Sequence, residues 1–192
     1  MPDAPGILDP AEAAGLLVAQ WVRDRRPLEV LAFESALESL DAAPRVFTVG
    51  AGRSGLVARA FAMRLAQMGI PAHVAGEATA PAIAGDGLLV VYSCSGETPS
   101  TLALVQIAER SGAEILAFTS EPKSPISREA TFTIQVSFSG CLGQALASGL
   151  LLPASSLFEI GAWMLSDALA AALARRRGQG DDDLRRRHAN LE

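Results

Sequence analysis

The sequence predicts an α/β protein in which helices cover both faces of a five-stranded parallel sheet. Short runs of β-branched and other apolar residues alternate with longer amphipathic segments, which is typical of parallel strands joined by right-handed crossovers. At 192 residues and 49% hydrophobic composition, the chain can bury one substantial core. Polar, glycine-containing loops follow two of the runs, where ligands bind in such sheets. We therefore expect a three-layer α-β-α sandwich with a ligand crevice beyond the strand ends.

The first 42 residues are predicted to form a helical extension ahead of the sheet. Asp9 and Pro10 supply an N-cap and a first-turn proline for a helix over 9–22. A second amphipathic helix is expected over 27–40. These two helices could pack on the core or on another subunit.

The α/β core is predicted to occupy residues 43–177, within one domain that spans 1–192. The expected strands are 45–49, 72–74, 88–92, 115–119 and 131–136. Between them, one helix is expected to follow Gly55 and end near Gly69, and another to span 98–111. A long helix should follow Pro153 and end at Arg177, because glycines come next. In the tail, 178–192, three aspartates predict a short helix that ends near His188.

A serine-rich loop, Ser93-Cys94-Ser95-Gly96-Glu97-Thr98, lies between a predicted strand and a predicted helix. Its three hydroxyl groups, the free backbone N–H groups and the positive end of the helix dipole could together bind an anion. An ordinary N-cap, formed by Ser95 or Thr98, would need only one hydroxyl. The loop therefore predicts a phosphate site.

A second loop, Gly50-Ala51-Gly52-Arg53-Ser54-Gly55, fits the G-x-G-x-x-G dinucleotide fingerprint between a strand and a helix. Glu77 follows at about the spacing of a ribose-binding acid, so a dehydrogenase is one alternative. However, Glu77 lies beyond Gly76 rather than at the tip of the second strand, and a dinucleotide site has no use for the serine-rich loop. Two anion-binding loops at neighbouring strand ends favour a small phosphorylated ligand.

Charge and composition argue against several other classes. The net charge of −5 makes nucleic acid an unexpected partner. The uncharged stretch 130–158 is long enough to cross a bilayer, but its serine, glutamine and proline side chains favour a buried strand and a packed helix, so no membrane contact is expected. Two cysteines are too few for a zinc site. Because the first residues carry no signal-peptide pattern, we expect a cytoplasmic protein.

The paired loops Gly50-x-Gly52-x-Ser54 and Ser93-x-Ser95-Gly96-x-Thr98 resemble those of the SIS (sugar isomerase) domain, which binds phosphosugars. Within it, three further segments are similar to the 6-phospho-3-hexuloisomerase family. These are Gly76-Glu77, Leu157-Phe158-Glu159 and Arg187-His188-Ala189-Asn190-Leu191-Glu192. The resemblance spans nearly the whole chain, although Cys94 stands where that family usually has a glycine.

This resemblance implies a flavodoxin-like SIS fold, a homotetramer or dimer, and no metal or organic cofactor. It also implies conversion of a phosphorylated ketohexose, D-arabino-hex-3-ulose 6-phosphate, to D-fructose 6-phosphate in the ribulose monophosphate pathway of formaldehyde fixation. A functional link to a 3-hexulose-6-phosphate synthase would follow. Another phosphosugar aldose–ketose isomerase and a non-catalytic SIS sugar-phosphate sensor are the alternatives, although no helix-turn-helix segment is predicted.

Carried over by position, the resemblance implies a set of site residues. The substrate-binding residues would be Gly52, Arg53, Ser54, Ser93, Cys94, Ser95, Gly96 and Thr98, and the catalytic residues Glu159, His188 and Glu77.

Each of the charged candidates also has a structural interpretation. Glu159 is the single charged residue in a long apolar stretch, which suits a general acid or base, yet it could close a capping box with Ser156. His188 is a tail residue unless the tail reaches a site in its own or a neighbouring subunit. Glu77 could bind sugar hydroxyls or be a solvated turn residue. Arg53 could neutralise substrate charge or pair with an acid at the crevice edge.

Overall fold

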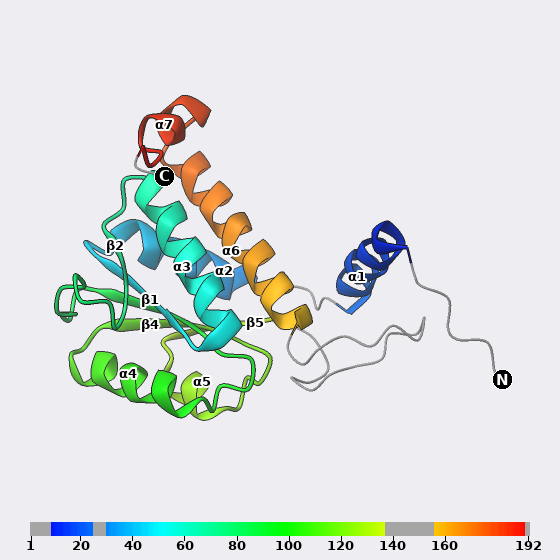
Figure 1. Ribbon diagram of the computed structural model, residues 1–192. Coiled ribbons are helices and arrows are strands. Elements are labelled where there is room, and N and C mark those ends of the chain that lie inside the picture. The colour runs from blue at the N-terminus through cyan, green and yellow to red at the C-terminus, as the bar shows by residue number, and fades with distance from the viewer. Residues whose placement is uncertain (1–8, 25–29, 137–155, 191–192) are drawn as a thin grey trace.

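The computed structural model describes residues 9–24, 30–136 and 156–190 (Figure 1). Its helices are α1 (Pro10–Asp24), α2 (Val30–Ala42), α3 (Gly52–Gln67), α4 (Pro99–Arg110), α5 (Pro125–Glu129), α6 (Ser156–Arg176) and α7 (Asp181–Arg186). Its strands are β1 (Val46–Gly50), β2 (Ala72–Val74), β3 (Leu88–Tyr92), β4 (Glu114–Thr119) and β5 (Phe132–Gln135).

The five strands form one parallel sheet with the order β2-β1-β3-β4-β5. Gly50 at the end of β1 pairs with Tyr92 at the end of β3, and Tyr92 pairs with Phe118 of β4. The loops that follow these three strands therefore emerge side by side at one edge of the sheet. The strand order is that of flavodoxin-like folds. The predicted fold class is confirmed.

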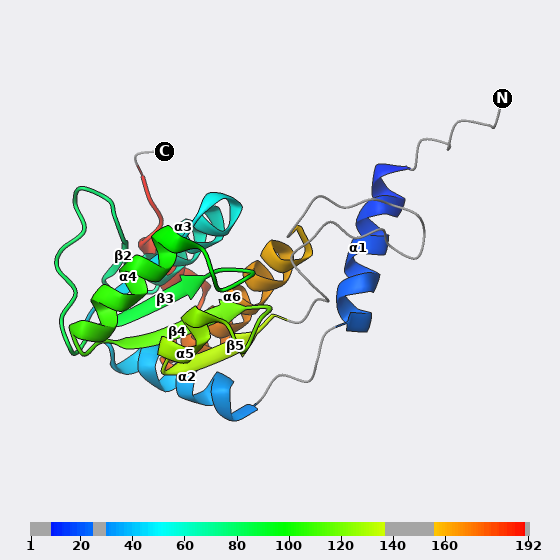
Figure 2. The same cartoon turned by 90° about the horizontal axis from the view of Figure 1, so that it is seen from below.

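Helices cover both faces of the sheet, as Figures 1 and 2 show. Helices α2, α3 and α6 enclose one apolar core, and α4 and α5 enclose the other. Strand β3 divides its side chains between the two: Leu88, Val90 and Tyr92 face the first core. Leu89 and Val91 face the second. The strand is apolar throughout because both of its faces are buried.

Helix α6 is long and apolar enough, by length and composition, to cross a membrane. More than half of its most apolar window is buried inside the protein. Leu165, Leu169 and Leu173 are all buried among residues of α2, α3 and the sheet. Its composition therefore follows from its place as the central helix of one layer.

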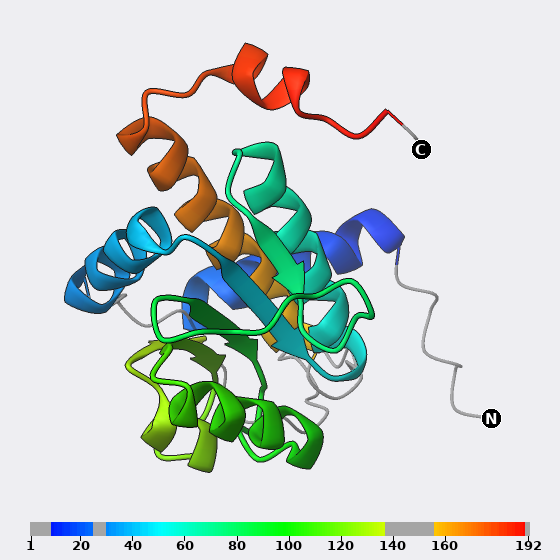
Figure 3. The same ribbon diagram turned by 90° about the vertical axis from the view of Figure 1, so that its left-hand side faces the viewer.

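The first and last described helices lie at opposite ends of α6. Helix α1 stands beside its N-terminal end, where Leu17 and Trp21 pack against the core (Figures 1 and 2). Helix α7 follows its C-terminal end (Figure 3), and Gln179 Nε2 donates to the Met68 carbonyl just beyond α3, at 2.9 Å. Helix α2 packs on the sheet beside α6 and β5, so it belongs to the sandwich rather than to a separate extension.

Most predicted elements are found within one to three residues of their expected ends. Strands 72–74 and 88–92 match residue for residue. The second helix runs two residues further than expected, to Ala42, and the start of the long helix between Pro153 and Ser156 lies outside the described residues. Helix α5 was not predicted, because five residues are too few for a helical period to show in the sequence.

Candidate active site

Two polar loops lie side by side at the carboxyl ends of β1 and β3. We call residues 50–55 the glycine loop and residues 93–98 the serine loop. Helix α3 follows the first loop on one face of the sheet, and α4 follows the second on the other face (Figure 1). Connections that diverge in this way leave a crevice between adjacent strands, which is where parallel sheets bind their ligands.

The glycine loop owes its composition to close packing. A Cβ on Gly50 would lie 2.7 Å from the backbone of Ser54, and a Cβ on Gly55 would lie 2.7 Å from the Gly50 carbonyl oxygen. Gly52 opens α3 with a φ of +56°. The turn therefore brings the start of α3 directly over the end of β1, with Ser54 buried and Arg53 exposed.

Hydrogen bonds among its own side chains and backbone curl the serine loop. Ser93 is buried; its Oγ accepts from the Gly96 N–H at 3.1 Å and lies 3.2 Å from Thr98 Oγ1. Ser95 Oγ accepts from the Glu97 N–H at 3.3 Å. Thr98 occupies the N-cap position of α4 yet makes no side-chain capping bond. A simple cap therefore does not explain the loop, which gathers three hydroxyl groups at a helix N-terminus as an anion site requires.

Gly96 packs against residues that follow β4. Its φ is +63°, and a Cβ there would lie 2.0 Å from Ser124 Oγ. The Ile126 N–H donates to the Gly96 carbonyl oxygen at 3.1 Å. The sequence reasoning missed this contact. The signal was Ser124 followed by Pro125, an N-cap and a first-turn proline, and Ser124 Oγ indeed accepts from the Ser127 N–H.

An ion pair joins α3 to α6 next to the glycine loop. Arg53 Nε donates to Glu159 Oε2 at 2.8 Å. The Glu159 side chain is only 9% exposed, whereas that of Arg53 is 62% exposed. Ser156, the predicted capping-box partner of Glu159, is the first described residue of α6 and lies within the helix. The residue before it lies outside the described ranges. Arg53 therefore pairs with an acid at the crevice edge, and that acid is the buried carboxylate.

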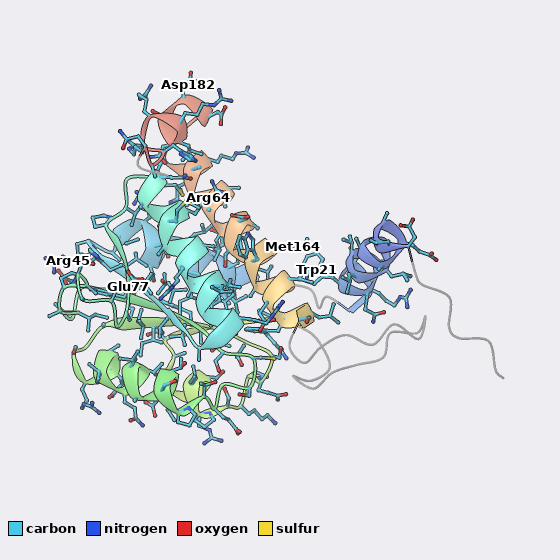
Figure 4. All side chains as sticks on the ribbon, viewed as in Figure 1. Trp21, Arg45, Arg64, Glu77, Met164 and Asp182 are labelled. Atoms are coloured by element: carbon cyan, nitrogen blue, oxygen red, sulfur yellow. The ribbon has the colours of Figure 1, made fainter. Side chains whose placement is uncertain are left out.

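A cavity of about 380 Å³ opens beside the ion pair. Beyond Arg53 and Glu159, its lining residues are Leu56, Val57, Ile160, Trp163 and Met164. Leu56, Trp163 and Met164 are large apolar side chains that are 60%, 47% and 40% exposed, and Figure 4 marks Met164 on the outer side of α6. The ion pair thus borders a polar loop on one side and an exposed apolar face on the other.

Glu77 lies just beyond β2 (Figure 4). Its Oε1 is 3.6 Å from Arg59 Nη2, a residue nearly two turns along α3 from Arg53, and both side chains are largely exposed. An apolar groove of about 270 Å³ between residues 75–83 and α4 adjoins it. The structure thus pairs Glu77 with Arg59, while Glu159 pairs with Arg53.

His188 lies at the far end of the sandwich. It follows α7, which rests against the C-terminal end of α3: Arg187 Nε lies 3.2 Å from where a Cβ on Gly69 would be. Arg53, in contrast, begins α3, and 16 helical residues span about 24 Å. In Figure 4, α7, marked by Asp182, lies at the opposite end of α6 from its first turn. Within one chain, the structure does not bring His188 to Glu159.

The remaining predicted residue, Cys94, is buried in the serine loop, with its carbonyl oxygen turned toward the loop after β4. Within the described ranges, no group of three or more histidine, cysteine, aspartate or glutamate side chains is placed to hold a metal ion.

Comparison with known proteins identifies the family. The profile of the SIS domain matches residues 39–157, which include both loops. The chain belongs to the SIS domain family. It is 39% identical over 150 residues to the 3-hexulose-6-phosphate isomerase of Mycobacterium gastri, covering 77% of this chain and 74% of that protein. The enzyme of the same name from Bacillus subtilis is 36% identical over 148 residues, covering 77% and 80%.

Solved structures agree with this assignment of the SIS domain family. A crystal structure from Methanococcus jannaschii superimposes with a TM-score of 0.77 at 27% identity, over 95% of this chain and 96% of that one. Its description infers a molecular function of 3-hexulose-6-phosphate isomerase for that protein. The predicted family resemblance is confirmed, and the chain is a phosphosugar isomerase of the SIS type.

Proposed function

We propose that this isomerase interconverts D-arabino-hex-3-ulose 6-phosphate and D-fructose 6-phosphate. The observation that carries the proposal is the identity of 36–39% to two proteins named 3-hexulose-6-phosphate isomerase, across about three quarters of each. The geometry of the crevice supports it, because an anion-binding loop and a buried carboxylate lie at neighbouring strand ends.

The serine loop is the proposed phosphate site. Ser95 and Thr98 offer hydroxyl groups at the N-terminus of α4. Ser93, at the start of the loop, hydrogen-bonds Gly96 in its middle and Thr98 at its end. Backbone N–H groups and the helix dipole add positive potential there without a charged side chain. A phosphate bound at this point would place the sugar over the end of β1, toward Arg53.

Glu159 is the proposed general base. The reaction moves a carbonyl group from C3 to C2, so a base must remove the proton on C2, and a proton must return to C3 of the cis-enediolate that forms. A carboxylate that is 9% exposed and held by Arg53 is shielded from water and fixed in direction. With the substrate beside Glu159, the Arg53 guanidinium would face the negative charge that develops on the enediolate oxygens, and such a cation stabilises the transition state.

Self-association is part of the proposal. Leu56, Met63, Trp163 and Met164 expose large apolar side chains on the adjoining outer faces of α3 and α6. Faces of this kind mark interaction sites in soluble proteins. A second copy seated there would close the cavity beside Glu159. His188, which lies far from Glu159 in its own chain, would in this proposal act in a neighbouring subunit.

The test is direct conversion of substrate by the purified chain. Enzymatically generated D-arabino-hex-3-ulose 6-phosphate is supplied in the presence of a chelator, and fructose 6-phosphate is measured over time. Arabinose 5-phosphate is supplied in parallel as the substrate of a sister reaction. Formation of fructose 6-phosphate alone supports the proposal. Turnover of arabinose 5-phosphate alone would favour a different phosphosugar isomerase, and saturable binding without turnover would favour a sensor.

A further inference from the structure

The end of β4, the loop that follows it and the first turn of α5, together residues 119–127, contact the serine loop on the side away from the crevice. Thr119 Oγ1 donates to the Cys94 carbonyl oxygen at 3.0 Å, and the Ser120 N–H donates to the same oxygen at 3.0 Å. One turn later, the Ile126 N–H donates to the Gly96 carbonyl oxygen at 3.1 Å. Two alternate carbonyl groups of the serine loop are therefore turned toward the sheet edge at β4.

These bonds fix which way the N–H groups of the serine loop point. In a trans peptide the carbonyl and the following N–H point in opposite directions. Because the Cys94 carbonyl is held by Thr119 and Ser120, the Ser95 N–H faces away from β4, toward the open side of the loop. Because the Gly96 carbonyl is held by Ile126, the Glu97 N–H faces the same way, where it bonds Ser95 Oγ.

Thr119 supplies the side-chain bond in this arrangement, beside the backbone bond from Ser120. Its residue is fully buried, and its single hydroxyl has two partners: it donates to Cys94 and accepts from the Glu121 N–H at 3.1 Å. The second bond aims the hydroxyl and shapes the turn that leads to Ser124. The Thr119 hydroxyl is thus enclosed between two loops and does not face the crevice.

We propose that Thr119 is a positioning residue for phosphate recognition, which orients the Ser95 N–H toward the bound phosphate through the Cys94 carbonyl. This inference rests on the proposed function of the serine loop as the phosphate site. It extends that site to a residue that belongs to neither anion-binding loop.

The test compares Thr119→Val with Thr119→Ser. Valine has nearly the same shape but cannot donate to Cys94, whereas serine keeps the hydroxyl and loses only a methyl group. We measure KM and kcat for the hexulose phosphate, the dissociation constant of inorganic phosphate by calorimetry, and the melting temperature. For Thr119→Val we expect about a tenfold rise in both KM and the phosphate dissociation constant, the usual effect of one lost hydrogen bond to a buried acceptor.

The expected pattern separates positioning from general stability. Thr119→Ser should bind phosphate within about threefold of the natural protein, although removal of a buried methyl group lowers its melting temperature. Unchanged phosphate affinity in Thr119→Val, or equal loss in both variants, would overturn the proposal. If Thr119→Val does not fold, Thr119→Cys carries the test, since its weaker thiol donor predicts a smaller loss of phosphate affinity, and unchanged affinity would again overturn it.

The experiment distinguishes a failure of the proposed reaction from a failure of the positioning role of Thr119. If the natural protein binds phosphate but does not convert the hexulose phosphate, the proposed reaction is wrong while the calorimetric comparison still decides the role of Thr119. If the natural protein does not bind inorganic phosphate and fructose 6-phosphate shows no difference between the variants, the positioning role is rejected.

Discussion

Arg53 Nε lies 2.8 Å from Glu159 Oε2, in an ion pair between residues 106 positions apart in the chain. One partner starts the helix after β1, and the other lies in the first turn of the last long helix. The pair therefore fixes a buried carboxylate at the edge of the crevice, next to the glycine loop, whose neighbour, the serine loop, is the proposed phosphate site.

Replacing Arg53 by methionine should impair both turnover and stability. Glu159 would stay buried without its cation, so the free-energy cost of removing its charge from water would no longer be compensated. Because Arg53 is largely exposed, we expect a loss of only about 1 kcal/mol in the free energy of unfolding, measured in urea. We expect kcat to fall at least about tenfold. Arg59→Met removes an equally exposed arginine from the same helix and serves as the control. Equal kinetic losses in the two variants would argue against a specific role of Arg53.

Gly96→Ala should disrupt the serine loop by a steric clash. Its Cβ would meet Ser124 Oγ at 2.0 Å, in addition to the strain of a positive φ. Gly178 has the same φ of +63° with open space around it, so Gly178→Ala measures the strain alone, about 1 kcal/mol. We expect Gly96→Ala to lose at least about 2 kcal/mol more than this control in the free energy of unfolding. It should also lose phosphate binding, measured by calorimetry. Equal effects of the two substitutions would contradict the close packing of Ser124 on Gly96.

Tyr92 makes the stability of the fold sensitive to alkaline pH. Burial raises the pKa of Tyr92 far above its ordinary value of about 10, and the hydrogen bond to Ser166 Oγ at 2.8 Å offsets only part of that rise. A raised pKa in the folded state means that the stabilisation is complete below pH about 10 and is lost as the pH rises above it.

Because Tyr92 is the only tyrosine in the chain, phenolate absorbance reports on it alone. We expect the phenolate signal to appear together with loss of far-ultraviolet circular dichroism, rather than near pH 10 in the folded protein. Tyr92→Phe should shift alkaline unfolding to higher pH and cost about 1 kcal/mol at neutral pH, since the link to Ser166 is lost. A phenolate that titrates near pH 10 while the fold persists would disprove the burial of this hydroxyl.

The apolar face of α3 and α6 should mediate self-association. Trp163→Glu places a charge on this face, and Ile107→Glu places one on α4, where the side chain is similarly exposed. We expect Trp163→Glu to reduce the molar mass measured by sedimentation equilibrium, because burying an unpaired charge in an interface is costly. Ile107→Glu should leave the mass unchanged. Identical masses for both variants and the natural protein would show that the association, if present, uses another surface.

The sequence carried most of the information about the fold, because its signals were local. The all-apolar run of β3 and the proline and aspartates that begin the helices each depend on neighbours a few residues away. The three hydroxyl groups of the serine loop were predicted to act together for the same reason. Their hydrogen bonds to Gly96 and Glu97 curl the loop, while phosphate binding by these hydroxyl groups stays a prediction.

What the sequence could not supply were contacts between distant segments. The sequence left undecided whether Arg53 contacts the substrate or pairs with an acid, because no local signal places α6 beside α3. The support from Thr119 and Ser124 was missed, since strand order decides which loops meet. His188 was assigned a catalytic role by resemblance, the structure places it at the other end of α3 from Arg53, and its role stays a prediction.

The central claim is that Glu159 moves a proton on a hexulose phosphate held by the serine loop. The most direct measurement follows the conversion of D-arabino-hex-3-ulose 6-phosphate in deuterated water by nuclear magnetic resonance. The natural protein and the control Glu114→Gln, altered at the opposite end of the sheet, should form fructose 6-phosphate at equal rates. Deuterium appears at C3 to the extent that the proton on Glu159 exchanges with solvent before it is returned. Glu159→Gln should bind the product normally and turn over about a hundredfold or more slowly. Full turnover by Glu159→Gln would contradict the account.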